Sequence, residues 1–147
     1  MAKAIQREYE KDFYAWTLHN AKLLREGRLS EVDIEHIAEE IESMGKSEKR
    51  ELVNRLAVLM AHLLKWQFQP TRRSKSWTMT IKNQRIELND LLEESPSLKK
   101  ELEGKFLHAY ERAVLMASEQ TGIDEDDFPK KPTFTLKECL KMSYFPD

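Results

Sequence analysis

The hydrophobic positions of the chain follow a helical period from its beginning. Between Asp12 and Gly27, apolar residues recur at steps of three and four, with Asp12 placed as an N-cap and Gly27 as a C-terminal glycine. A second such segment begins near Ser30, where Ser30 and Asp33 have the spacing of a capping box, and it ends at Gly45. The pattern therefore predicts two helices before residue 46.

The most apolar helix is predicted from about Glu48 to Gln67, with Ser47 as its cap and Pro70 beyond its end. Leucines repeat along one of its faces, and Val, Ala, Met and Leu residues repeat along the adjoining face. Apolar side chains then cover about half of the circumference, which is wide for a surface helix. This width predicts the central helix of the domain.

Two further helices are predicted beyond Pro70. An apolar stripe from Trp77 to Leu92 indicates a fourth helix, which stops at Pro96. A fifth helix is predicted from Pro96 to about Gln120, because proline is tolerated in a first helical turn and Gly122 provides an end.

The last segment predicts a short C-terminal helix, which opens with a capping box between Thr135 and Glu138. The expected fold is all-α: an irregular bundle of about five helices plus this short one, packed around the helix near residues 48–67. We expect a single helical domain over residues 1–147. Its core is predicted to include Leu18, Ile37, Ile41, Leu56, Leu59, Leu63, Trp77, Ile81, Leu88, Leu102 and Phe106.

Composition narrows the class of protein. Of the 147 residues, 40% are hydrophobic and 34% are charged, which is typical of a globular domain, and 4 Gly and 5 Pro are too few for an all-β fold. A net charge of -2 gives no overall attraction to nucleic acid or to an anionic membrane. The single cysteine, Cys139, cannot form an internal disulfide, and the sequence shows no apolar run of membrane-spanning length. We expect a cytoplasmic protein.

One acidic flank raises the question of a metal. Asp33, His36 and Glu40 lie three and four residues apart, so they share one side of the second predicted helix and offer two carboxylates and an imidazole. A helical di-iron site needs a second Glu-x-x-His motif, which the sequence lacks. The favoured interpretation is a solvated flank with an ordinary His–Glu pair, and we expect neither a metal nor another cofactor.

A basic stretch with aromatic residues supports a nucleic-acid hypothesis. Between residues 65 and 85 the sequence has no acid, and the cations alternate with Trp66, Phe68 and Trp77. Such side chains can contact phosphates and stack on bases. The residues proposed for this role are Lys65, Arg72, Arg73, Lys75, Lys82, Arg85 and Trp77.

An enzyme hypothesis depends on helix packing. If the second, third and fourth predicted helices lie side by side, then Glu40, His62 and either Gln84 or Arg85 converge at one end of a cleft. A carboxylate, an imidazole and a cation together can transfer a proton and stabilise charge. The alternative for Gln84 is a buried amide that is satisfied by a neighbouring helix.

Many ordered segments resemble the bacterial domain-of-unknown-function family twenty-nine. The segments that carry the resemblance are Asp12–Trp16, Ile37–Glu42, Met44–Gly45, His62–Trp66, Gln69–Pro70, Ser76–Trp77, Gln84–Arg85, Ser95–Leu98, Ala109–Tyr110, Thr121–Gly122, Phe128–Pro129 and Phe145–Pro146. The resemblance covers nearly the whole chain. It implies a small helical domain without an established activity, and it supplies no catalytic residues.

The leading functional hypothesis is a non-enzymatic protein-interaction or regulatory module. The sequence contains no phosphate-binding glycine loop and no nucleophile-elbow motif. Its acidic second helix contrasts with the basic stretch, so oppositely charged faces are expected to bind a complementary surface. The expected partner is another protein or a second copy of the chain, nucleic acid is the alternative, and no membrane association is expected.

Overall fold

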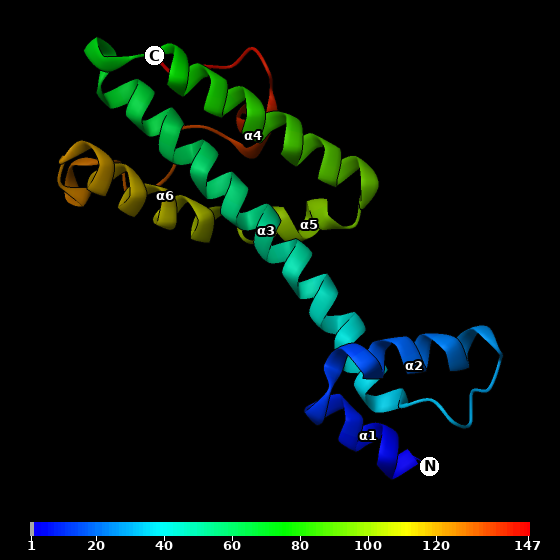
Figure 1. The fold of residues 1–147 in the computed structure, drawn as a ribbon. Helices are drawn as coiled ribbons and strands as arrows, with labels where there is room; N and C mark the ends of the chain where they lie inside the picture. Colours follow the sequence, from blue (N-terminus) through cyan, green and yellow to red (C-terminus); the bar gives the residue numbers. More distant parts are fainter. Residues whose placement is uncertain (1) are drawn as a thin grey trace. The chain divides into compact units, whose positions relative to one another are not determined.

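The structure, a computed structural model, describes residues 2–147, apart from the side chains of Ala2, Lys3 and Gln6. These residues form an all-α fold, as predicted, and no strand is found among them (Figure 1). In chain order the elements are α1 (Ala2–Lys11), α2 (Phe13–Arg25), α3 (Ile34–Phe68), the 3-10 helix η1 (Pro70–Arg72), α4 (Lys75–Glu94), α5 (Leu98–Gly104), α6 (Phe106–Thr121), the 3-10 helix η2 (Glu125–Asp127) and α7 (Leu136–Leu140).

The helices fall into two compact units. The first unit ends at Ser47 and the second begins at Glu48. Helix α3 continues through this division and supplies helical residues to both units. Each unit has a hydrophobic core of its own, so the expectation of one domain over residues 1–147 stays a prediction.

Helix α2 has the ends that its sequence predicts. The carboxylate of Asp12 accepts a hydrogen bond from the backbone N–H of Ala15 at 3.1 Å, which caps the helix. Beyond its other end lies Gly27, whose φ of 71° is the left-handed conformation that glycine adopts without strain. The sequence does not predict α1, because Ile5 and Tyr9 are the only large apolar residues in this mostly polar and charged segment.

The core of the first unit differs from the predicted one. Its buried hydrophobic residues are Ile5, Trp16, Leu23 and Val32. Leu18, predicted for the core, is exposed, because α2 turns the face of Trp16 and Leu23 inward. Ile41 is exposed as well, whereas Ile37 packs against the core as expected.

The prediction that Gly45 ends a helix is wrong. Gly45 lies inside α3, which runs without interruption from Ile34 to Phe68. Gly45 does not have the positive φ of a helix-ending glycine, whereas Gly27 and Gly122 do. A glycine within a helix costs about 1 kcal/mol relative to alanine, and the hydrogen bonds of the neighbouring turns outweigh that cost. The helices expected at 30–45 and 48–67 are therefore one.

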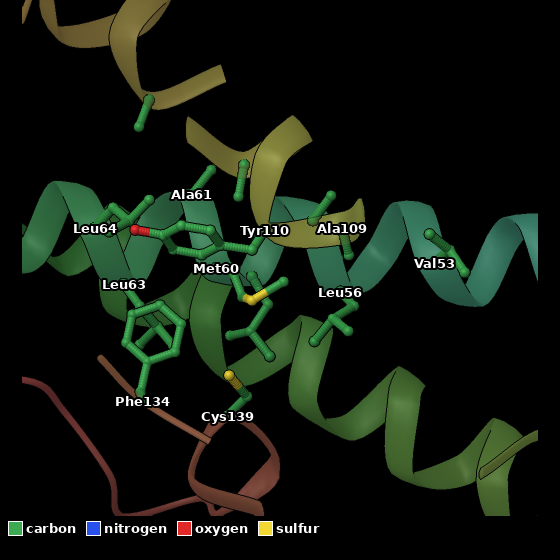
Figure 2. Close-up of a cluster of buried hydrophobic side chains, with 14 of the residues drawn as sticks. Val53, Leu56, Met60, Ala61, Leu63, Leu64, Ala109, Tyr110, Phe134 and Cys139 are labelled. Atoms are coloured by element: carbon green, nitrogen blue, oxygen red, sulfur yellow. The ribbon is translucent and has the colours of Figure 1, made fainter. Parts of the chain in front are cut away.

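The second unit packs around the last twenty residues of α3, as the sequence predicts. Leu52, Leu56, Leu59 and Leu63 are fully buried on α3, in the same cluster as Tyr110 of α6. Figure 2 shows Leu56, Leu63 and Tyr110 within this cluster. Trp77 and Phe106, also predicted for the core, are only half-buried. The predicted core residues that the structure buries completely are Leu56, Leu59, Leu63, Ile81, Leu88 and Leu102.

The fifth predicted helix is two helices. Helix α5 ends at Gly104 and α6 begins at Phe106, with Lys105 as the junction between them. The N–H of Lys105 donates to the carbonyls of Glu101 and Leu102, which closes α5 with a tighter final turn. Helix α6 ends at Gly122 as predicted, with a φ of 79°.

The C-terminal segment forms the predicted capping box. Thr135 Oγ1 accepts from the N–H of Glu138 at 3.1 Å, and the Glu138 carboxylate accepts from the N–H of Thr135 at 3.0 Å. These reciprocal bonds begin α7, whose Cys139 is buried in the core of the second unit.

Candidate functional site

A buried carboxylate organises the polar groups of the first unit. The side chain of Asp33 is fully buried where α3 begins. Its Oδ2 accepts from the indole N–H of Trp16 at 3.0 Å and from Nδ1 of His36 at 2.6 Å. The backbone N–H of Asp33 donates to the Asn20 side chain at 2.9 Å. Asp33 thus joins α2 to the first turn of α3.

Tyr9 of α1 extends this network. Its ring stacks on the imidazole of His36, with 3.9 Å between ring centroids and 13° between planes. Its hydroxyl donates to Glu40 one turn further along α3, and this bond raises the pKa of Tyr9 to about 12. The favoured interpretation of a solvated flank with a His–Glu pair is therefore wrong: Asp33 is buried, His36 binds Asp33, and Glu40 binds Tyr9.

The electrostatics favour an ionised pair. Burial alone would raise the pKa of Asp33, but hydrogen bonds from His36 and Trp16 outweigh it and hold the pKa below its ordinary value. The hydrogen bond to Asp33 in turn raises the pKa of His36. Within residues 2–147, no group of three or more His, Cys, Asp or Glu side chains is placed to hold a metal ion. Asp33 instead forms hydrogen bonds with His36 and Trp16, and Glu40 forms one with Tyr9.

Outside this network, α3 exposes an apolar stripe. Ile34, Ala38, Ile41 and Met44 follow one another at steps of four, three and three, so they lie on one side of the helix. Ile34 is 66% exposed, Ile41 58% and Met44 61%. We call these four residues the α3 stripe. Side chains of this size in a contiguous exposed row are typical of an interaction surface.

An acidic row borders the α3 stripe. Glu35, Glu39 and Glu42 are exposed, and at about 100° per residue they lie together on the side next to Ala38. None of the three is within 4.0 Å of a described basic side chain. Between Leu29 and Gly45 the sequence has six acidic residues and no Lys or Arg. The α3 stripe is therefore bordered on one side by negatively charged side chains.

In the second unit, the most buried charge is Arg85 of α4. Its Nε donates to the carbonyl of Cys139 at 2.7 Å, its Nη2 to that of Tyr144 at 2.7 Å, and its Nη1 to that of Met142 at 3.3 Å. Arg85 is fully buried and fastens α7 and the C-terminal segment to α4. The sequence signal for this role was its position in the stripe of Ile81 and Leu88, at steps of four and three.

Gln84, considered for a buried amide, is half-buried. Its Oε1 accepts from Nη1 of Arg55 on α3 at 3.3 Å. This contact is the neighbouring-helix partner that the sequence alternative proposed. Gln84 and Arg85 therefore have different environments, although they are adjacent in the chain.

Lys65 is the second cation that the fold encloses. It is 8% exposed, and burial lowers its pKa. Its Nζ donates to Oε1 of Gln120 at 2.9 Å and lies 4.9 Å from the ring centroid of Trp77. Nδ1 of His62 donates to the carbonyl of Val58 at 2.9 Å, and burial lowers the pKa of this imidazole as well. Lys65 therefore joins α3 to α4 and α6, whereas His62 binds within α3.

The family comparison covers both units. The protein family described as a domain of unknown function, DUF29, matches residues 8–145. The chain belongs to the DUF29 family. This confirms the family that the ordered sequence segments indicate. No curated protein and no solved structure matches the chain.

The enzyme hypothesis for this DUF29 domain loses its structural premise. It requires Glu40 and His62 to lie on two helices that pack side by side, but both residues lie on α3. Each also has its own partner: Glu40 binds Tyr9 of α1, and His62 binds the carbonyl of Val58 in its own helix. The proposed cation, Arg85, is buried and donates to three backbone carbonyls.

The nucleic-acid candidates of this DUF29 domain divide into two groups. Lys65 and Arg85 are buried, so their charges do not face solvent. The ring of Trp77 is in contact with the ammonium group of Lys65. The guanidinium of Arg73 lies 4.7 Å from the ring centroid of Trp66, so this ring already has a cation stacked on it. The candidates that remain exposed are Arg72, Arg73, Lys75 and Lys82.

Within the described residues, no helix is long and apolar enough to span a membrane.

Proposed function

We propose that this DUF29 domain is a protein-interaction module, and that its first unit binds a basic amphipathic helix of another protein along the α3 stripe. One observation carries the proposal: large apolar side chains remain exposed on α3 beside an acidic row. An amphipathic helix with Lys or Arg next to its apolar face complements both features.

The α3 stripe offers enough apolar surface to bind. Full burial of an Ile or Met side chain contributes about 1.5–3 kcal/mol, before the costs of association are subtracted. Ile34, Ile41 and Met44 are all more than half exposed in this structure. A partner that covers them gains apolar burial from three anchors on one helix face.

The network beneath the stripe supports binding by holding α3 in place. Asp33 and Glu40 point toward α2 and α1, where they bind Trp16 and Tyr9. These contacts fix the rotation of the helix, so the α3 stripe is presented in one orientation. A surface that is already ordered loses less conformational entropy on binding.

The acidic row argues for a different protein rather than a second copy. If two copies paired through the same stripe, Glu35, Glu39 and Glu42 of each would approach the like charges of the other. A basic partner instead brings opposite charges to this border. We therefore expect the chain alone to remain monomeric.

A titration with synthetic peptides tests the proposal. An amphipathic helical peptide of leucine and lysine is added to the ¹⁵N-labelled full chain, and binding is followed by the amide shifts of α3. We expect saturable binding that weakens at high salt. Exchanging the lysines of the peptide for glutamates should abolish it.

Two matched variants locate the binding surface. Ile34→Ser with Ile41→Ser should weaken binding at least about tenfold, because both anchors lose apolar burial. Met79→Ser with Ile86→Ser removes two exposed apolar side chains of α4 and should leave binding unchanged. Equal losses in the two variants, or equal binding of the glutamate peptide, would overturn the proposal. A dimer that Ile34→Ser dissociates would instead identify a second copy as the occupant.

We also propose a cytoplasmic location. The only cysteine of the sequence is Cys139, and it is a buried free thiol. A single cysteine buried without a disulfide is typical of proteins in reducing compartments. Fractionation of cells that produce the tagged full chain tests this, and recovery outside the cytoplasm would contradict it.

A further inference from the structure

A cleft lies between α5 and α7 of the second unit. It has a volume of about 700 Å³, within the range of about 300–1,000 Å³ that is usual for small-molecule sites. Leu136 and Leu140, both half-buried, supply apolar surface from α7. The remaining lining residues are Lys99, Glu103, Lys137 and Lys141.

The charge of the cleft is unbalanced. Three lysines line it, against one acidic residue, Glu103. Lys99, Lys137 and Lys141 form no ion pair with a described side chain within 4.0 Å. Lys137 lies within α7 and Lys141 directly follows its last residue. A bound anion would offset the excess positive charge of the lining.

The walls of the cleft are anchored from behind. Arg85 donates to the carbonyl of Cys139 at 2.7 Å, and Asn89 donates to that of Leu140 at 3.3 Å, so α7 is fastened to α4. On the other wall, Leu102 is fully buried and holds α5 in the core. Because neither wall depends on a ligand for its position, the cleft is largely formed before binding.

We propose that this cleft binds an amphipathic carboxylate, with an unbranched acyl chain on Leu136 and Leu140 and the carboxylate between Lys137 and Lys141. The lining residues include no aromatic ring on which a nucleobase would stack. Their apolar groups are aliphatic side chains, and their excess charge is positive, which together match an acyl chain with an anionic end. This site lies on α5 and α7 and is independent of the α3 stripe.

Titration of the ¹⁵N-labelled full chain with decanoate, kept below its micelle-forming concentration, tests the proposal. We expect saturable shifts at Leu136, Leu140 and Lys99. Acetate lacks the acyl chain and decyltrimethylammonium carries the opposite charge, so neither should produce these shifts in the same concentration range. Absence of saturable decanoate binding, or equal binding of the alkylammonium ion, overturns the proposal.

Charge variants test where the carboxylate lies. Lys137→Gln with Lys141→Gln should weaken decanoate binding about fivefold or more, since exposed charge contacts are individually weak but act together. Lys75→Gln with Lys82→Gln removes two exposed cations from α4 and should have no effect. Circular dichroism checks that both variants fold. Unchanged binding in the first variant contradicts the assignment, and binding to anionic vesicles without binding to free decanoate would show a membrane surface instead.

Discussion

Arg85 and Cys139 are 54 positions apart in the chain, yet the Arg85 guanidinium donates to the Cys139 carbonyl at 2.7 Å. The same guanidinium reaches the carbonyls of Met142 and Tyr144, and it lies 5.5 Å from the ring centroid of Phe145. One buried side chain therefore donates the hydrogen bonds that hold the C-terminal segment against α4. The cleft next to α7 depends on this contact.

Removal of this guanidinium should destabilise the second unit. We expect Arg85→Met to lower the free energy of unfolding by about 2–4 kcal/mol, because the carbonyls of Cys139, Met142 and Tyr144 lose a charged donor. Arg85→Lys should also destabilise, since an ammonium cannot reproduce the fork of donors. Urea denaturation measures both. Arg72→Met, at an exposed position, is the control, and an equally small change in all three variants would contradict the role of Arg85.

The pair of His36 and Asp33 should make the stability of the first unit depend on pH. The folded pKa of His36 is raised above its ordinary value of 6.5 by the hydrogen bond to Asp33. Its contribution is therefore fully present below pH 6.5 and is lost as the pH rises through the folded pKa. The pKa of Asp33 is lowered from 3.8, so its own contribution is lost only as strong acid protonates it.

Unfolding curves between pH 5 and 9 test this sign in wild type and in His36→Gln. The stability difference between the two proteins should be largest at the acid end of this range and should shrink as the pH rises. A difference that stays constant, or that grows toward alkaline pH, would falsify the charged pair. His108→Gln removes an exposed histidine and serves as the control.

Replacing Gly45 and Gly122 by alanine should change the stability of the protein in opposite directions. Gly45 lies inside α3 and a Cβ there would meet no atom within 4 Å, so Gly45→Ala should stabilise by about 0.5–1 kcal/mol. Gly122 has a φ of 79°, where alanine is strained, so Gly122→Ala should destabilise by about 1 kcal/mol. Thermal unfolding of both variants distinguishes the signs. A destabilised Gly45→Ala protein would indicate that the helix ends at Gly45 after all.

Two apolar residues of α3 should differ sharply in their contribution to stability. Leu59 is fully buried in the core of the second unit, so Leu59→Ala should cost about 2–5 kcal/mol. Ile41 belongs to the exposed α3 stripe, and Ile41→Ala should change stability by less than about 0.5 kcal/mol. Denaturant unfolding of the two variants provides the comparison. A large loss for Ile41→Ala would mean that the stripe is covered within the chain.

Much of the candidate site depends on partners that are distant in the sequence. The spacing of Asp33, His36 and Glu40 places them on one helix flank, and in the structure His36 binds Asp33 while Glu40 lies one turn further along α3. The spacing does not reveal Trp16 and Tyr9, which decide that Asp33 binds an indole and that Glu40 binds a phenol. Those partners come from other helices, whose packing no local pattern specifies.

The sequence by itself determined the features that depend on neighbouring residues. The cap at Asp12, the end at Gly27 and the capping box of Thr135 with Glu138 each use hydrogen bonds that span a few positions. The broad apolar face of α3 predicted the centre of the second unit for a similar reason, since helical period follows from spacing alone.

Only the tertiary structure decided the meaning of the ambiguous positions. Gly45 and Gly27 are the same residue, but Gly45 remains helical and Gly27 adopts a positive φ. Ile41 and Leu59 are both apolar residues of α3, yet one is exposed and the other is buried, because burial depends on which helices pack there. Arg85 can be buried only because carbonyls from the end of the chain accept its hydrogen bonds. These carbonyls replace the water molecules that would otherwise solvate its charge.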